Sequence, residues 1–317
     1  METDPASDAP FFVLSVDGGG IRGVFPAHLL QNLRGRASID PLNRFDFFAG
    51  TSTGSIIVAA VAVGVSPADI VSLYRDLGGA IFGDPIKSFY PKNLQFAAHS
   101  KYRNSGLRSA LQAVFGERRL GEIAVPLLLP AVDIGNGGVH VFKSQYDQRF
   151  TRDADVRLVD AVMASCSAPV FFDPVTVNNY LLCDGGLWAN NPALAATIDA
   201  QHRLGIAKNR LRVFSLGTGH ARTEYGTQQD RKWGFANGWG HKKFIEFMMS
   251  LQSQSTTNYL QLLLDSHQVL RLNFESDRAL PLDDVSSIDD LISRADRVFT
   301  HESDSIRQFL NQENSNA

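Results

Sequence analysis

The sequence has few cysteines, no long apolar run and little net charge, and each of these features argues against a class of protein. Two cysteines, Cys166 and Cys183, are too few for a disulfide framework and suit a reducing compartment. The longest apolar stretch, residues 56–65, is too short to cross a bilayer. A net charge of −3 over 317 residues gives no sign of a DNA-binding surface.

The N-terminus also lacks the features of a secretory signal, because METDPASDAP is acidic and polar. We therefore expect a flexible N-terminal segment over residues 1–10, and any membrane contact must be peripheral. The composition, 44% hydrophobic and 20% charged, is that of an ordinary globular protein. Since no repeat or linker interrupts the chain, we expect a single domain over residues 11–317.

Apolar runs alternate with segments of helical spacing along the chain. The strands are expected at residues 11–16, 45–50, 125–134, 139–143, 180–183 and 211–216. The main helices are expected at residues 24–36, 54–64, 106–115, 156–165, 241–265 and 286–312. Residues 80–105 are rich in glycine, proline and asparagine and are predicted to form a long surface loop, a candidate lid. This alternation predicts an α/β fold with a mainly parallel sheet covered on both faces.

The pentapeptide GTSTG at residues 50–54 matches the GxSxG pattern of a nucleophile elbow. Such an elbow holds Ser52 in a strained turn between a strand and a helix, and Gly50 and Gly54 leave room for the neighbouring backbone. The predicted strand before it and the apolar helix after it favour the elbow over a plain turn.

The segment DGGGIRG at residues 17–23 admits three interpretations. It fits the GxGxxG pattern through Gly18, Gly20 and Gly23, but no acidic residue ends a second strand about 20 residues later, as a dinucleotide site requires. It also fits an oxyanion hole, in which bare N–H groups converge on one oxygen. A structural turn is the third interpretation. The elbow downstream favours the oxyanion hole, with Arg22 holding the loop.

A serine nucleophile needs a base, and the sequence offers two kinds. Of the eight histidines, His220 is the best placed for a triad, yet none has a recognisable catalytic context. Asp184 has one, because it ends the apolar strand YLLC and two glycines follow it. The carboxyl ends of strands are where open α/β sheets place their sites.

In their order and spacing, DGGGIRG, GTSTG and DGG resemble the three signatures of patatin-like phospholipases. Three further blocks are similar to the same family, namely ASCSAPVFFDP (164–174), DGGLWANNP (184–192) and FSLGTG (214–219). The resemblance covers roughly residues 11–220.

The resemblance implies a three-layer α/β/α fold and a Ser–Asp dyad in place of a triad. Ser52 would be the nucleophile and Asp184 the base, with neither a cofactor nor a metal. The oxyanion hole would be formed by Gly18, Gly19, Gly20 and Arg22, and the motifs are completed by Asp17, Gly23, Gly50, Gly54, Gly185 and Gly186. The substrate would be a fatty-acyl ester of a membrane phospholipid, and the enzyme would be cytoplasmic and peripheral at the inner membrane when active.

The segment at residues 228–247 interleaves basic and aromatic side chains. The residues that make it a candidate ligand or lid region are Arg231, Lys232, Trp233, Trp239 and Lys242. Aromatic rings stack on bases and cations contact phosphates, but the same composition suits lipid headgroups. A loop packed by its own tryptophans is the third interpretation.

The family offers a hypothesis for this segment. Compact bacterial patatin-like proteins include effectors of cyclic-oligonucleotide anti-phage signalling, and this chain is similar to them in size. We therefore hypothesise a cyclic oligonucleotide activator. The alternatives are an unregulated lipid acyl hydrolase or esterase, and a non-catalytic lipid- or nucleotide-binding protein on the same fold.

Overall fold

The computed structural model describes residues 9–82, 99–221, 233, 238–239, 241–278 and 280–311. Most of the N-terminal segment expected over residues 1–10, and most of the loop expected over residues 80–105, therefore lie outside the described residues.

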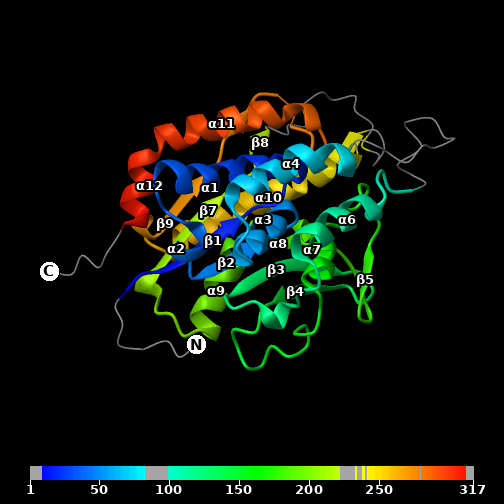
Figure 1. Ribbon diagram of the computed structural model, residues 1–317, viewed down its shortest axis with the longest axis horizontal. Helices are drawn as coiled ribbons and strands as arrows, with labels where there is room; N and C mark the ends of the chain where they lie inside the picture. The colour runs from blue at the N-terminus through cyan, green and yellow to red at the C-terminus, as the bar shows by residue number, and fades with distance from the viewer. Residues whose placement is uncertain are drawn as a thin grey trace.

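One sheet of eight strands forms the centre of the molecule (Figure 1). Its strands are β1 (Phe11–Val16), β2 (Phe47–Gly50), β3 (Leu127–Asp133), β4 (Gly138–Lys143), β5 (Val175–Val177), β6 (Tyr180–Asp184), β7 (Leu211–Leu216) and β9 (Val269–Leu272). The order is β5-β6-β3-β2-β1-β7-β9, and β4 also pairs with β3. The five strands β3, β2, β1, β7 and β9 run parallel, whereas β4, β5 and β6 pair antiparallel. The sheet is mainly parallel, as predicted.

Helices cover both faces of this sheet. They are α1 (Val24–Arg36), α2 (Pro41–Arg44), α3 (Thr53–Ala62), α4 (Pro67–Phe82), α6 (Asn104–Phe115), α7 (Leu158–Cys166), α8 (Gly186–Ala189), α9 (Ala193–Arg203), α10 (His241–Leu263), α11 (Ile288–His301) and α12 (Ser303–Leu310). Successive side chains of β1 point to opposite faces of the sheet and so belong to two cores. Phe12 and Leu14 lie in the core under α1, α3 and α11, whereas Phe11 and Val13 lie in the core under α9 and α10. Figure 1 shows α11, α1 and α4 on one side of the sheet and α9 on the other. The fold is therefore a three-layer α/β/α sandwich.

The predicted strands do not include β9 or the short parallel pair of β8 (His220–Ala221) and β10 (Glu275–Ser276). β9 has only four residues, one of them Arg271, so its pattern resembles that of a loop. β9 is a strand because it forms backbone hydrogen bonds with residues 213–216 of β7, which lie more than fifty residues earlier in the sequence.

The strand β3 brings two distant strand ends together. β4 pairs along residues 128–133 and therefore occupies one edge of β3. On the other edge, β2 pairs with Leu127 and Leu128, and β6 pairs with residues 131–133. Because β2 is parallel and β6 antiparallel to β3, their carboxyl ends point at each other across Pro130. A proline fits there, since no strand pairs with that position on this edge.

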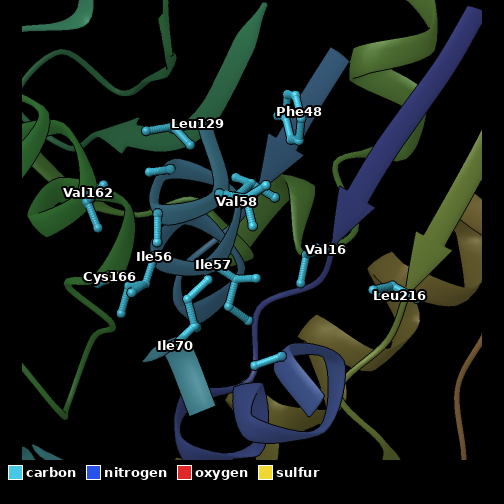
Figure 2. Packing of buried hydrophobic residues seen from close by; sticks show 14 of the residues in the cluster. Val16, Phe48, Ile56, Ile57, Val58, Ile70, Leu129, Val162, Cys166 and Leu216 are labelled. Atoms are coloured by element: carbon cyan, nitrogen blue, oxygen red, sulfur yellow. The ribbon is translucent and has the colours of Figure 1, made fainter. Parts of the chain in front are cut away.

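Helix α3 begins very close to β1, and glycine makes this approach possible. A Cβ at Gly54 would lie 2.2 Å from the Val16 carbonyl oxygen, and one at Gly50 would lie 2.2 Å from the Gly54 carbonyl oxygen. Behind this contact, Ile57 and Val58 of α3 pack with Val16 and Phe48 of the sheet (Figure 2).

We predict that Gly54→Ala lowers the free energy of unfolding by about 1–3 kcal/mol, because the added methyl group forces α3 away from β1. Gly35→Ala in α1 is the matched control, since nothing lies within 4 Å of its Cβ position. This control should raise the stability by up to about 1 kcal/mol, as alanine replaces glycine in an exposed helix. Urea unfolding followed by circular dichroism measures both, and a shift in the same direction for the two variants would contradict the prediction.

Candidate active site

Ser52 lies at a strained turn between β2 and α3. Its φ of 52° and ψ of −124° are unusual for a residue with a side chain, and it is the N-cap residue of α3. The turn is held in place because the Ser52 N–H donates to Ser165 Oγ at 3.0 Å. The neighbouring Thr51 hydroxyl donates to the Ala189 carbonyl oxygen at 2.6 Å. A backbone strained in this way, and held on both sides, is typical of a nucleophile elbow.

Asp184 ends β6 and is 2% exposed. Its Oδ1 accepts a hydrogen bond from the Gly186 N–H at 2.7 Å, whereas its Oδ2 has no hydrogen-bond partner among the described residues. Burial raises the pKa of Asp184 to about 6, against the lowering effects of the Ser52 hydroxyl and the Gly186 N–H. Gly185 is needed for the approach of this turn to β3, because a Cβ there would lie 2.3 Å from the Pro130 carbonyl oxygen.

Ser52 and Asp184 line one narrow pocket of about 60 Å³. The Ser52 hydroxyl is near enough to lower the pKa of Asp184, although Oδ2 accepts no hydrogen bond of good geometry. Such loose contacts are common in unliganded active sites. The remaining walls are almost wholly apolar, with Ile56, Leu73, Leu107, Leu111, Phe171 and Phe172 among them. Figure 2 shows Ile56 of α3 close to Cys166 of α7, another wall residue.

No histidine is among the described residues that line this pocket. His220 lines a different cavity, where its Nδ1 lies 2.8 Å from the Ser250 hydroxyl oxygen. The arrangement around Ser52 thus has a carboxylate as its base candidate and no imidazole within the described part of the chain.

The glycine loop passes beside Ser52. The Gly18 N–H donates to the Asn190 carbonyl oxygen at 3.0 Å, and the Ile21 N–H donates to the Leu282 carbonyl oxygen at 2.8 Å. The N–H groups of Gly19 and Gly20 have no acceptor among the described residues. Gly20 lines the Ser52 pocket, and its φ of 58° and the closeness of the Leu282 carbonyl oxygen exclude a side chain there.

Two charged side chains, the buried Asp17 and the partly buried Arg22, hold this loop from behind. Asp17 accepts two hydrogen bonds from Arg271, at 3.1 Å and 2.6 Å, so that the ion pair is bidentate. Arg22 donates from Nε to the Gly19 carbonyl oxygen at 3.2 Å, and burial lowers the pKa of its guanidinium. Gly23 allows the loop to approach α3, because a Cβ there would lie 2.2 Å from the Thr53 hydroxyl.

No local pattern points to Arg271, which lies 254 residues from Asp17. Thr218 was also missed, although it lies within the FSLGTG block, and its hydroxyl donates to the Gly18 carbonyl oxygen at 2.7 Å. The family blocks marked the segment, but the hydrogen bond depends on β7 lying beside β1.

The candidate ligand or lid region is described only in part. Arg231, Lys232 and the side chain of Lys242 lie outside the described residues. Trp233 is 49% exposed, and its ring lies 5.2 Å from that of Trp239, which in turn contacts Phe244 edge-on. The described part of this region is thus an aromatic cluster at the start of α10.

The family profile of patatin-like phospholipases matches residues 14–197, which is more than half of the chain. The chain belongs to the patatin-like phospholipase family. It is accordingly a lipid acyl hydrolase. None of the described helices is long and apolar enough to span a bilayer.

Several curated proteins are similar to this chain. A cGAMP-activated phospholipase of Pseudomonas aeruginosa is 27% identical over 81% of this chain and 76% of its own length. A cUMP-AMP-activated phospholipase of Escherichia coli is 29% identical over 68% of this chain and 67% of its own length. Patatin-like protein 1 of Arabidopsis thaliana is 30% identical over 73% of this chain and 64% of its own length.

We predict that the carboxyl of Asp184 destabilises the folded protein above pH 6. Its pKa of about 6 in the folded state lies above the ordinary aspartate value of 3.8, so the folded state holds the proton more tightly than the unfolded state does. This contribution to stability is complete below about pH 4 and is lost as the pH rises through about 6, a change of about 3 kcal/mol. Asp184→Asn should therefore be more stable than the wild type at pH 8, with a much smaller difference at pH 4. Urea unfolding at both pH values measures this, and an equal difference at the two would contradict it.

Proposed function

We propose that this protein hydrolyses fatty-acyl esters of membrane phospholipids through a dyad of Ser52 and Asp184. The observation that carries the proposal is that the strained Ser52 and the buried Asp184 share one apolar pocket. Apolar walls suit an acyl chain, and the exclusion of water favours proton transfer to a carboxylate that would be a weak base in solution.

In the first step, the Asp184 carboxylate accepts the proton of the Ser52 hydroxyl as Oγ bonds to the ester carbonyl carbon. The carbonyl oxygen becomes negative, and the N–H groups of Gly19 and Gly20, which lack other acceptors among the described residues, donate to it. The Gly18 N–H would first have to leave the Asn190 carbonyl oxygen in order to contribute.

The leaving alcohol then takes the proton from Asp184, and an acyl-enzyme remains on Ser52. A water molecule gives its proton to Asp184 and attacks the acyl carbon, which releases the fatty acid and restores the Ser52 hydroxyl. The pKa of about 6 keeps Asp184 largely ionised at neutral pH while making it a better base than an exposed aspartate.

We expect Ser52→Ala and Asp184→Asn each to lower phospholipid hydrolysis by about 10⁴-fold or more, because the nucleophile or its base is lost. Ser72→Ala and Asp76→Asn in α4 are matched controls with exposed side chains and should keep wild-type activity. Release of fatty acid from vesicles measures activity, and circular dichroism shows whether each variant is folded. A folded Ser52→Ala protein with wild-type activity would exclude the dyad.

We also propose that a cyclic oligonucleotide activates the enzyme in anti-phage defence, and that the active enzyme binds peripherally at the cytoplasmic membrane. Support comes from relatives whose names state activation by cGAMP or cUMP-AMP.

Activation is tested by following hydrolysis of vesicles and of a soluble short-chain ester, each with and without cGAMP or cUMP-AMP. We expect at least one nucleotide to raise the hydrolysis of vesicles tenfold or more. Equal rates under all conditions would favour an unregulated acyl hydrolase, and hydrolysis of the soluble ester alone would favour an esterase.

A further inference from the structure

Two cavities of different character lie beside the catalytic pair. The Ser52 pocket is narrow and apolar, and the proposed mechanism places the acyl chain in it. A second cavity, of about 480 Å³, is lined mainly by polar side chains, and we call it the polar cavity. Met249 of α10 lines both. With an acyl chain in the apolar pocket, the polar cavity is the source of water for the second half of the reaction, since water avoids apolar cavities.

Asn190 lines the polar cavity and also lies beside the catalytic pair. It is 5% exposed. A Cβ at Gly18 would lie 2.4 Å from Asn190 Oδ1 and 3.3 Å from Ser52 Cβ. A Cβ at Gly186 would lie 3.1 Å from the same Oδ1 and 3.0 Å from Asp184 Oδ1. Because both positions are glycine, neither places a side chain between the amide oxygen and the two catalytic side chains.

The hydrogen bonds of Asn190 fix which end of its amide faces the catalytic pair. Ser253 Oγ lies 3.2 Å from Asp17 Oδ2 and donates its one hydrogen there. Ser253 Oγ must therefore accept the hydrogen bond of 2.9 Å from Asn190, so the amide atom on that side is Nδ2. The main-chain oxygen of Asn190 accepts from the Gly18 N–H. Asn190 Oδ1 remains, and this buried oxygen has no hydrogen-bond donor among the described residues.

A buried acceptor without a donor costs stability and is rare in folded proteins, so this oxygen needs an explanation. Met249 Cε lies 3.0 Å from the same Cβ position of Gly186, so the end of the methionine side chain lies beside Asn190 Oδ1. Methionine is unbranched and flexible, and its side chain can move aside without a change of the backbone. A water molecule from the polar cavity can then donate one hydrogen to Asn190 Oδ1 and the other to Asp184.

We propose that Asn190 is a third catalytic residue, which binds the water that hydrolyses the acyl-enzyme. The water oxygen bonds to the acyl carbon. One of its hydrogens passes to Asp184 as a proton, and the other is held by Asn190 Oδ1 and stays on the fatty acid. The bond from the acyl carbon to Ser52 Oγ then breaks, and Oγ takes the proton from Asp184. The proposal rests on the proposed function, since it adds a residue to the second half of that reaction.

Methanol tests this role because it carries one O–H hydrogen, whereas water carries two. Water cleaves the acyl-enzyme to the fatty acid, and methanol cleaves it to the methyl ester. Methanol needs only Asp184 as an acceptor, so its attack does not depend on Asn190. The full chain is supplied with the para-nitrophenyl ester of octanoic acid in buffer that contains methanol, and the ratio of methyl ester to fatty acid is measured by gas chromatography.

Asn190→Leu removes the acceptor at nearly constant size and should raise this ratio about tenfold or more, because hydrolysis slows and methanolysis does not. Ser253→Ala leaves the Asn190 amide without its Oγ partner and should raise the ratio by a smaller factor, about twofold or more. Asn32→Leu is the matched control and should keep the wild-type ratio. Asn32 is also buried and donates to Asp296, but it lines neither cavity.

An unchanged ratio in a folded Asn190→Leu protein overturns the proposal, even if both products form more slowly. A residue that only held the glycine loop would slow both products by the same factor. Circular dichroism shows whether each variant is folded. If Asn190→Leu does not fold, Ser253→Ala decides, and an unchanged ratio in that variant overturns the proposal.

The wild type separates this inference from the proposed function. If the wild type forms neither product, the proposed function fails, and the role of Asn190 fails with it. If the wild type forms both products and the variants keep its ratio, only the role of Asn190 fails and the hydrolase stands.

Discussion

The shared edge of β3 is the constraint on which the candidate active site depends. β2 and β6 arrive at this edge from opposite directions, and their carboxyl ends stop on either side of Pro130. Ser52 follows the first strand and Asp184 ends the second. Ser52 and Asp184 line the same pocket because β2 and β6 pair with neighbouring parts of the same edge of β3 and both end there. Glycines at positions 50, 54 and 185 then allow close backbone contacts at these strand ends, because a Cβ at any of them would collide with a carbonyl oxygen.

Burial sets the chemistry of this pair. The apolar walls that would receive an acyl chain also remove water from Asp184, and this desolvation raises its pKa. An aspartate of ordinary pKa is a poor base for a serine hydroxyl. In the proposed mechanism, the raised pKa of Asp184 therefore reduces the gap in basicity that donors to the oxyanion would have to offset. Above pH 6 the buried, ionised carboxyl lowers the free energy of unfolding. Perturbed pKa values of this kind are common at functional sites.

The glycine loop is held on one side by hydrogen bonds and faces Ser52 on the other. Asp17, Arg22, Thr218 and Asn190 all line the polar cavity behind it, and three of them bind carbonyl oxygens of the loop. A loop without side chains cannot be positioned by packing of its own, so its position depends on these neighbours. The direction in which its N–H groups point is therefore set by these neighbours.

The sequence by itself determined the order of most strands and helices, the family, and Ser52 and Asp184 as candidates. These follow from local patterns: alternating apolar runs, a glycine on either side of a serine, and an aspartate at a strand end. The tertiary structure alone decided which residues support them. Arg271, Ser165 and Ser253 of α10 reach the loop and the elbow from distant segments, through pairing of β9 with β7 and packing of α7 and α10. Single-sequence patterns carry no signal for such contacts, because the free energy that fixes them comes from burial and pairing between segments more than fifty residues apart.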